Sequence, residues 1–217
     1  MPNLNMYLHA IVNQTYITCP KEKYTYQGLT FTFGNTVIDM EDRWLIPCTH
    51  KLFAPASSEQ MAAVEEIIGY ELPEDFREFL QMTNGAQLYV APLGWKPSWS
   101  QRENFIEYLI YSSEELITLN RTLLQDFRIM LGKDPDFQEI HKLNYLAFCD
   151  AHDGNYLAIL LEGPFRGMIF YLDKEYLFRP YSEIEADFYY IVTQSFGRWM
   201  RLVADTKGTG GFGEQRN

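Results

Sequence analysis

One stretch of the chain, YELPEDFREFLQMTNGAQLY at residues 70–89, constrains the fold more than any other. Proline needs no backbone donor and has a helical φ angle, so Pro73 favours the first turn of a helix. Glu74 and Asp75 then place negative charge at the positive end of the helix dipole. The segment therefore predicts a helix that begins at about residue 74.

The same stretch predicts where this helix ends and which element comes next. Three apolar side chains share one helical face: Phe76, Phe79 and Leu80. Asn84 and Gly85 are typical of the left-handed residue that ends a helix. We therefore expect a short helix that leads directly into a strand at 86–90.

Length and composition indicate a folded protein. The chain has 217 residues, 47% of them hydrophobic, with 15 Tyr and 15 Phe, which allows a substantial core and favours one elaborated domain. The net charge is −11, which argues against a nucleic-acid-binding protein because such proteins need a basic face. An acidic surface suits a cationic partner, although many cytosolic proteins are acidic for solubility alone.

Cysteine content and hydropathy indicate a soluble, cytoplasmic protein without a membrane segment. The cysteines are only Cys19, Cys48 and Cys149, which is no disulfide framework. The N-terminal residues lack the pattern of a signal peptide, and no apolar run approaches the roughly 20 residues that span a membrane. The common phosphate, hydrolase and metalloprotease motifs are absent, so we expect no cofactor, no metal and no enzymatic activity.

The pattern of elements predicts an α+β fold. Residues 1–56 form a β-rich N-terminal extension, with strand candidates at 7–12, 15–19, 29–33, 36–40 and 44–47 and a hairpin turn at Gly34-Asn35. Residues 57–205 form the main domain, with further helices at 58–68, 113–131 and 182–203 and strands at 86–91, 105–111, 144–148, 155–161 and 168–172. Short turns between the strands favour an antiparallel meander sheet with helices packed around it. Residues 206–217 are a flexible, glycine-rich tail.

Capping-box spacing supports two of these helices. Ser57 stands three residues before Gln60, and Ser112 stands three residues before Glu115. A hydroxyl and a carboxylate or amide at this spacing can satisfy each other's backbone donors. The helices are therefore expected to begin at residues 58 and 113.

Two segments resemble the SUKH superfamily, which includes the yeast Smi/Knr cell-wall regulators. The first is VEEIIGYELPEDFREFLQMTNGA at 64–86, and the second is LAFCDAHDGNYLAILLEG at 146–163. The family pattern is matched by Leu72, Pro73, Asp75, Phe76, Phe79, Leu80, Asn84 and Gly85, which we expect to be structural. The N-terminal 55 residues have no counterpart in the family, and the turn at 150–154 carries a histidine where such turns often hold only glycine and acids.

The resemblance implies a binding protein. Bacterial members are mostly immunity proteins that bind and block a cognate polymorphic toxin, and they have no catalytic residues to transfer to this chain. The yeast branch implies the alternative of an intracellular signalling or scaffold protein. For the first function the partner is a protein toxin domain, with a basic nuclease as one candidate, and no nucleic acid or membrane is bound directly.

The turn at 149–155 has the most enzyme-like composition. It holds Asp150, His152 and Asp153 beside Cys149. Aspartate and asparagine suit a turn because they hydrogen-bond their own backbone, and zinc needs more ligands than this turn offers. Turn formation, contact with a partner, and catalysis or metal binding are the three interpretations, in that order of preference.

Two further groups are candidates for partner binding. Trp95 and Trp99 lie in a proline-containing loop, and tryptophan is favoured at binding hot spots, although the loop could instead cover the sheet. Glu65, Glu66 and Glu78 belong to an acidic run opposed only by Arg77. They form either a solvated helix face or a surface that attracts a cationic toxin.

Overall fold

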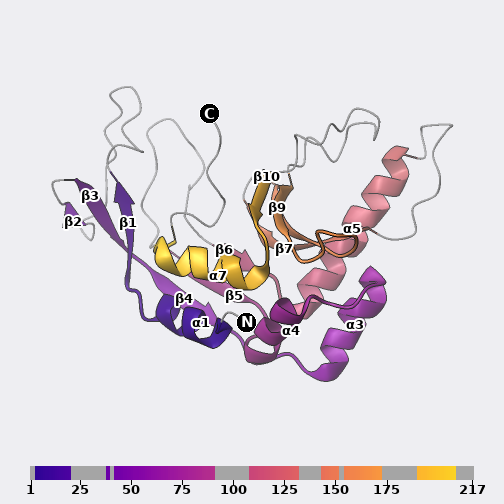
Figure 1. Cartoon of the computed structure of the whole chain (residues 1–217), viewed down its shortest axis with the longest axis horizontal. Coiled ribbons are helices and arrows are strands. Elements are labelled where there is room, and N and C mark those ends of the chain that lie inside the picture. The colour runs from indigo at the N-terminus through magenta and orange to yellow at the C-terminus, as the bar shows by residue number, and fades with distance from the viewer. Residues whose placement is uncertain are drawn as a thin grey trace.

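Among the residues that the structure describes, an antiparallel sheet of seven strands forms the centre of the fold (Figure 1). The computed structural model describes residues 3–20, 38–39, 42–90, 108–131, 143–151, 154–172 and 190–208. From one edge to the other, the strands are β10 (Tyr190–Thr193), β9 (Ile169–Leu172), β8 (Tyr156–Leu160), β7 (Tyr145–Asp150), β6 (Tyr108–Ile110), β5 (Ala86–Val90) and β4 (Thr49–Leu52). Every neighbouring pair is antiparallel, which confirms the predicted α+β meander.

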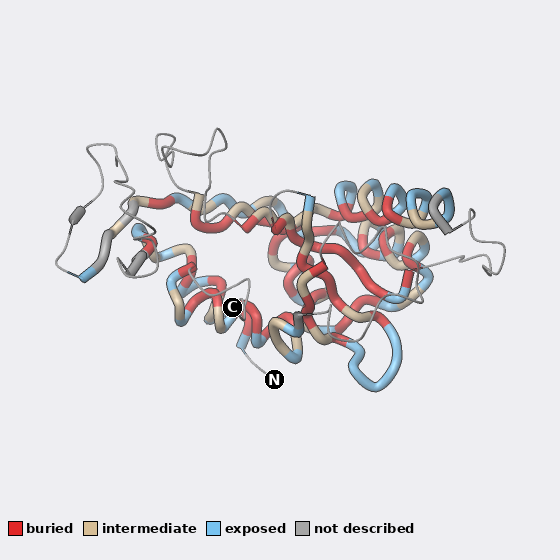
Figure 2. The backbone as a smooth tube through the Cα atoms, turned by 90° about the horizontal axis from the view of Figure 1, so that it is seen from above, coloured by how far each residue is buried: buried red, intermediate tan, exposed pale blue. Residues whose placement is uncertain are grey.

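Helices cover both faces of this sheet. The described helices are α1 (Leu4–Val12), α3 (Ser58–Ile68), α4 (Glu74–Met82), α5 (Ser113–Leu131) and α7 (Phe196–Asp205). On one face α7 packs against α1 and α4, and on the other α5 lies on β7 and packs against α3. Figure 2 shows buried residues running through the strands and exposed residues along the outer side of the long helix. In the described part of the chain, no helix is long and apolar enough to cross a membrane.

Alternation along β7 assigns its side chains to the two faces. Leu146 and Phe148 join the larger hydrophobic cluster on the α7 side, whereas Tyr145 and Ala147 join the cluster beneath α5. The register with β8 shifts between Ala147 and Cys149, and this bulge brings Cys149 to the α7 side as well. Cys149 is fully buried there, so its predicted role as a small core residue is confirmed.

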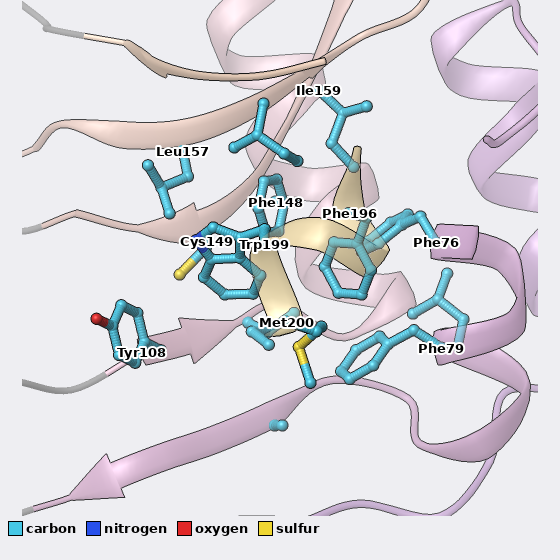
Figure 3. Packing of buried hydrophobic residues seen from close by; sticks show 14 of the residues in the cluster. Phe76, Phe79, Tyr108, Phe148, Cys149, Leu157, Ile159, Phe196, Trp199 and Met200 are labelled. Atoms are coloured by element: carbon cyan, nitrogen blue, oxygen red, sulfur yellow. The ribbon is translucent and has the colours of Figure 1, made fainter. Parts of the chain in front are cut away.

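Aromatic rings fill the core on the α7 side (Figure 3). The Phe196 ring lies 4.9 Å from Phe76, 5.0 Å from Phe79 and 5.5 Å from Phe148, measured between centroids. Trp199 packs edge-on against Phe148 at 5.3 Å. The predicted apolar face of α4 therefore meets the first turn of α7 and the centre of the sheet.

The predicted capping boxes are present at α3 and α5. The Ser57 hydroxyl accepts from the Gln60 N–H, and Gln60 Oε1 accepts from the Ser57 N–H at 2.9 Å. At α5 the Glu115 carboxylate accepts from the Ser112 N–H at 2.7 Å. These local contacts explain why the two helices begin where the sequence predicts.

The prediction of a strand at 7–12 was wrong, because this segment lies in helix α1. The Asn3 side chain accepts from the Met6 N–H at 3.1 Å and caps the helix. One face of α1 is buried, through Leu4, Leu8 and Ile11. Its contacts with α7 and α4 outweigh the strand preference of the local composition.

The rest of the described N-terminal segment is extended, as expected. Strand β3 (Arg43–Pro47) pairs with β1 (Tyr16–Pro20) and with β2 (Ile38–Asp39) in a small antiparallel sheet. Only Cys48 separates β3 from β4, which is the last strand of the main sheet. The strand candidate at 29–33 and the turn at Gly34-Asn35 lie outside the described residues.

The last helix begins later than predicted. Residues 190–193 form the edge strand β10, and α7 starts at Phe196 after the Ser195 side chain caps it by accepting from the Arg198 N–H. The β-branched pair Ile191 and Val192 favours a strand, and this preference prevails here over the helical spacing. Residues 182–189 lie outside the described part of the chain, as do residues 209–217 of the predicted tail.

The end of α4 also differs from the prediction. Its last residue is Met82, and the next, Thr83, is extended with φ −155°, so no left-handed residue ends the helix directly. Gly85 does have the expected positive φ, +88°, but it serves the turn into β5. A Cβ at this position would lie 2.8 Å from both the Ile110 carbonyl oxygen and the Ser112 nitrogen, so only glycine fits.

Candidate functional site: a pocket at the α3–α4 connector

A pocket of about 540 Å³ lies where three separate parts of the chain meet. One wall is the α3–α4 connector with the first turn of α4, the second is the β8–β9 turn, and the third is the start of α7. In Figure 1, the chain leaves β10 and enters α7 beside α4. The lining residues are 71–75, 77–78, 166–167 and 194–195. Most of the first wall is the LPED segment at 72–75, from which the sequence predicts the start of α4.

Asp75, one of the lining residues, joins α4 to α7. Its Oδ2 accepts from the backbone N–H of Gly197 at 2.8 Å, so an acid in the first turn of one helix satisfies a free donor in the first turn of another. The negative charge also lies at the positive end of both helix dipoles. Asp75 therefore joins the starts of two helices.

Asn84 makes an equivalent link from the end of α4 to the start of α5. Its Oδ1 accepts from the Ser113 N–H at 2.7 Å, and its Nδ2 donates to the Ser113 hydroxyl at 3.0 Å. Both residues are buried, so these bonds satisfy polar groups that water cannot reach. Residues 72–85 thus position the starts of α4, α5 and α7.

Two contacts hold the β8–β9 turn against the connector. Arg166 donates to the Glu71 carbonyl oxygen at 2.9 Å, and the Tyr70 hydroxyl donates to the Glu162 carboxylate at 2.7 Å. Desolvation, with the Glu162 carboxylate beside it, raises the pKa of Tyr70 to about 12, so the phenol stays a donor at neutral pH. The turn is also closed by its own backbone bonds, from Arg166 N to Gly163 O and from Met168 N to Phe165 O.

The rim of the pocket carries carboxylates that are free to bind. Glu71, Glu74 and Glu78 are exposed, and their side chains have no hydrogen-bond or ion-pair partner within the described residues. The one arginine on α4, Arg77, is paired with Glu65. The pocket therefore presents negative charge to solvent, with the Arg166 guanidinium at its other side.

An exposed aromatic side chain lies next to this pocket along the chain. Phe165 is 62% exposed and immediately precedes Arg166 in the β8–β9 turn. A large apolar side chain in water is unfavourable by about 1.5–3 kcal/mol relative to full burial. It lies on a turn held by hydrogen bonds, one residue before the lining residue Arg166, and so offers a preformed apolar contact on the turn that forms one pocket wall.

The three predicted acids have different surroundings. Glu78 lines the pocket, and Glu66 is exposed on α3 away from the lining. Glu65 accepts from the Leu72 N–H at 2.7 Å and pairs with Arg77, so it ties α3 to the start of α4. Its side chain is only 21% exposed, in contrast to the solvated position that the sequence suggests.

The other predicted candidates are not brought to the pocket. Asp150 ends β7 opposite Tyr156, whereas the β8–β9 turn follows Leu160, which pairs with Tyr145 at the other end of the same two strands. Asp150 therefore lies at the opposite end of the sheet from the β8–β9 turn that forms one pocket wall. Trp95, Trp99, His152 and Asp153 lie outside the described residues.

Some lining residues could not be found from the sequence. Glu71 and Glu74 stand in the acidic run that is visible in the sequence, but Arg166, Gln194 and Ser195 come from distant segments. The only local signal for Ser195 is its helix-capping residue type, and this signal gives no information about a pocket. Tertiary folding alone brings these residues to α4.

The described residues contain few groupings of metal-ligating or nucleophilic side chains. They contain no group of three or more His, Cys, Asp or Glu side chains that could hold a metal ion. A Cys–His contact among them joins Cys48 Sγ to His50 Nε2 at 3.8 Å. Burial raises the pKa of Cys48 to about 11, which keeps the thiol protonated and a poor nucleophile.

Removing the carboxylate of Asp75 is expected to destabilise the fold. Asp75→Ala should lower the free energy of unfolding by about 1–2 kcal/mol, since it removes a helix cap and a favourable charge. Glu74→Ala is the matched control, because Glu74 lies in the same helical turn and has no such contact. Urea unfolding of both variants checks this, and equal losses would mean that the bond to Gly197 contributes nothing.

These features define the class of protein: an antiparallel α+β domain whose helix starts are joined through one LPED–NG segment, with a pocket beside it. The model of the SMI1 / KNR4 family (SUKH-1) matches residues 55–202. This match covers more than half of the chain, so the protein belongs to that family. No curated protein matches the sequence. The predicted superfamily is thereby confirmed.

Proposed function

We propose that this chain is a non-catalytic binding protein, an immunity protein that neutralises a cognate toxin domain by covering its working surface. The pocket at the α3–α4 connector is the contact site. The observation that carries the proposal is the combination of three exposed carboxylates, Glu71, Glu74 and Glu78, with Phe165 on a turn that is already held in place. No chemical step is needed for such a role.

Charge supports a cationic partner. The chain has a net charge of −11, and a toxin that cuts nucleic acids needs a basic face to hold phosphates. Attraction between opposite charges can speed association by about 10–1000-fold at low salt, and added salt weakens it. The acids would therefore govern the association rate, and an apolar contact such as Phe165 would govern dissociation.

The first test is neutralisation in cells. The chain is co-expressed with candidate toxin domains, chosen from the genes adjacent to its own, and growth is measured. We expect growth to be rescued by the unaltered chain and lost when the pocket is altered by Glu74→Lys with Glu78→Lys. The control is Glu59→Lys with Asp126→Lys, which makes the same charge change at exposed positions of α3 and α5 outside the pocket lining.

The second test is the kinetics of binding to the purified toxin at two salt concentrations. The pocket variant should associate at least about tenfold more slowly at low salt, with a smaller loss at high salt. Phe165→Ala should instead dissociate about tenfold faster at both salt concentrations. The assignment of this site would be overturned if the association rate depends neither on the salt concentration nor on the pocket acids, in variants that fold normally.

The same experiments address the alternative from the yeast branch. If the chain does not rescue growth but binds an endogenous non-toxin protein through the pocket, a signalling or scaffold function replaces the immunity function. The pocket assignment would then stand, and the identity of the partner would change.

A further inference from the structure

A second polar cluster lies at the other edge of the sheet, where the N-terminal segment joins the main domain. The pairing of β4 with β5 shifts register between Thr49 and Lys51, so His50 faces two residues of β5 instead of one. One of them, Tyr89, has φ +57°, in the left-handed region that residues other than glycine rarely adopt. This is a bulge whose strained residue is a fully buried tyrosine.

The His50 ring satisfies the backbone of this bulge. Its Nε2 lies 2.9 Å from the Gln14 carbonyl oxygen, and its Nδ1 lies 3.1 Å from the Tyr89 backbone nitrogen. A carbonyl only accepts, so Nε2 must carry the proton, and a backbone N–H only donates, so Nδ1 must be free of one. The contacts together require a neutral imidazole in one tautomer.

Gln14 and Tyr89 extend this cluster to the end of α7. The Gln14 side chain accepts from the Tyr89 hydroxyl and donates to the Ala204 carbonyl oxygen at 3.1 Å. The Tyr89 hydroxyl also lies 3.3 Å from the Val203 carbonyl oxygen. Gln14 and Tyr89 therefore join the segment that follows α1 and the bulge of the sheet to the last turn of α7, and His50 holds the backbone of both residues.

We propose that His50 is a pH-sensitive latch that holds the N-terminal helix α1 on the main domain while its imidazole is neutral. Protonation puts a second N–H at Nδ1, facing the Tyr89 N–H. Two donors at this distance repel, so the ring must turn away and leave a buried backbone donor without a partner. The hydrogen bonds between the bulge and Gln14 then weaken. The packing of α1 against α7 weakens as a result.

The surroundings of His50 favour the neutral form. Burial lowers the pKa of His50 from its ordinary 6.5, and the bond to Gln14 opposes this only in part. Among the described residues, the ionisable groups touching the ring are the Cys48 thiol and the Tyr89 phenol. Burial raises the pKa of both, so both are neutral near pH 7. Lys51 points its ammonium over the Phe53 ring, and Asp205 at the end of α7 pairs with Arg201.

The direction of the pH effect follows from the lowered pKa. With a folded-state pKa below 6.5, the closed latch is fully stable above about pH 6.5 and loses stability as the pH falls toward the folded-state value. Within that window, the equilibrium constant for opening should rise by up to about tenfold per pH unit. Below it the effect levels off.

Cys48 reports on this opening because its Sγ lies 3.8 Å from His50 Nε2 and is buried. In a full-length chain with Cys19→Ser and Cys149→Ser, labelling of Cys48 by dithiodipyridine is measured from about pH 7.5 to 5 and divided by the rate in the denatured chain. We expect protection to fall by up to about tenfold per pH unit below about 6.5. With His50→Asn, which keeps an acceptor for the Tyr89 N–H but does not titrate, protection should not depend on pH.

Two controls make this result specific. His9→Gln removes an exposed histidine of α1 and should behave as the unaltered chain. A chain in which only Cys149 remains reports global unfolding, and it should stay protected throughout. The proposal is overturned if Cys149 and Cys48 lose protection together, or if His50→Asn shows the same pH dependence as the unaltered chain.

A second measurement applies if His50→Asn does not fold. The ring resonances of His50 in the unaltered chain are followed by NMR against pH, together with the Tyr89 amide. We expect His50 to titrate below its ordinary pKa of 6.5 and the Tyr89 amide to shift in step with it. A titration at the ordinary value, or a Tyr89 amide that does not respond, would contradict the latch.

Discussion

Replacing Phe196 with alanine is expected to lower the free energy of unfolding by about 3–5 kcal/mol, the cost of emptying a buried phenylalanine site. The ring is fully buried and lies in the middle of the aromatic cluster that joins α4, α7 and the sheet (Figure 3). Removing it leaves a cavity between α7, α4 and β7 that the surrounding side chains can fill only in part. The midpoint and slope of urea unfolding measure the loss.

Phe165→Ala is the matched control for this change. It removes the same side chain from a position that is 62% exposed, so its effect on stability should stay within about 0.5 kcal/mol. A loss below about 1 kcal/mol for Phe196→Ala would mean that α7 does not pack on the sheet through this ring.

Gly85→Ala is expected to destabilise the protein by about 2–4 kcal/mol. The cost of backbone strain at a positive φ adds to the cost of the steric clash of the new Cβ. The φ of +88° is unfavourable for any residue with a Cβ, and the new atom would lie 2.8 Å from backbone atoms of Ile110 and Ser112. Backbone cannot move aside as a flexible side chain can. The junction of β6 with α5 would have to shift, and with it the cap that Asn84 provides.

Gly163→Ala separates the two contributions. Gly163 has a similar φ, +79°, but nothing lies within 4 Å of the position of its Cβ, so only backbone strain of about 1 kcal/mol applies. The difference between the two variants in urea unfolding isolates the collision at Gly85. Equal losses would show that the close approach of β5 to the β6–α5 junction is absent.

The sequence predicts those elements whose signals are local. Helices α3 and α5 begin where a serine and its capping partner stand three residues apart, and α4 begins just after Pro73. The antiparallel pairing of β7, β8 and β9 in a meander follows from the short, glycine-containing turns between them. In each case a few neighbouring residues determine the backbone, so no knowledge of the rest of the fold is needed.

Elements that depend on distant contacts were predicted less well. Residues 7–12 have the composition of a strand, but one face of α1 is buried against α7 and α4. The strand β10 pairs with β9 in a segment whose spacing suggests a helix. For such short segments the tertiary partner decides, and single-sequence patterns do not identify it.

The candidate site was predicted in part for the same reason. The acidic run at 65–78 is visible in the sequence, but the sequence does not separate Glu65, which is paired with Arg77, from Glu78, which faces the pocket. Arg166 joins the pocket lining only because the β8–β9 turn folds against the connector. The LPED–NG pattern was interpreted as structural, and Asp75 and Asn84 show why, since each caps a different helix.

The central proposal, that the pocket at the α3–α4 connector is the contact site, is tested most directly by hydrogen–deuterium exchange of the chain alone and in complex with the proposed toxin partner. Binding at the pocket should slow exchange in three segments together, at 70–78, 161–168 and 193–197, which contain its lining. The far end of β7, at Asp150, should exchange at an unchanged rate. Slower exchange at another face, with these three segments unaffected, would contradict the claim.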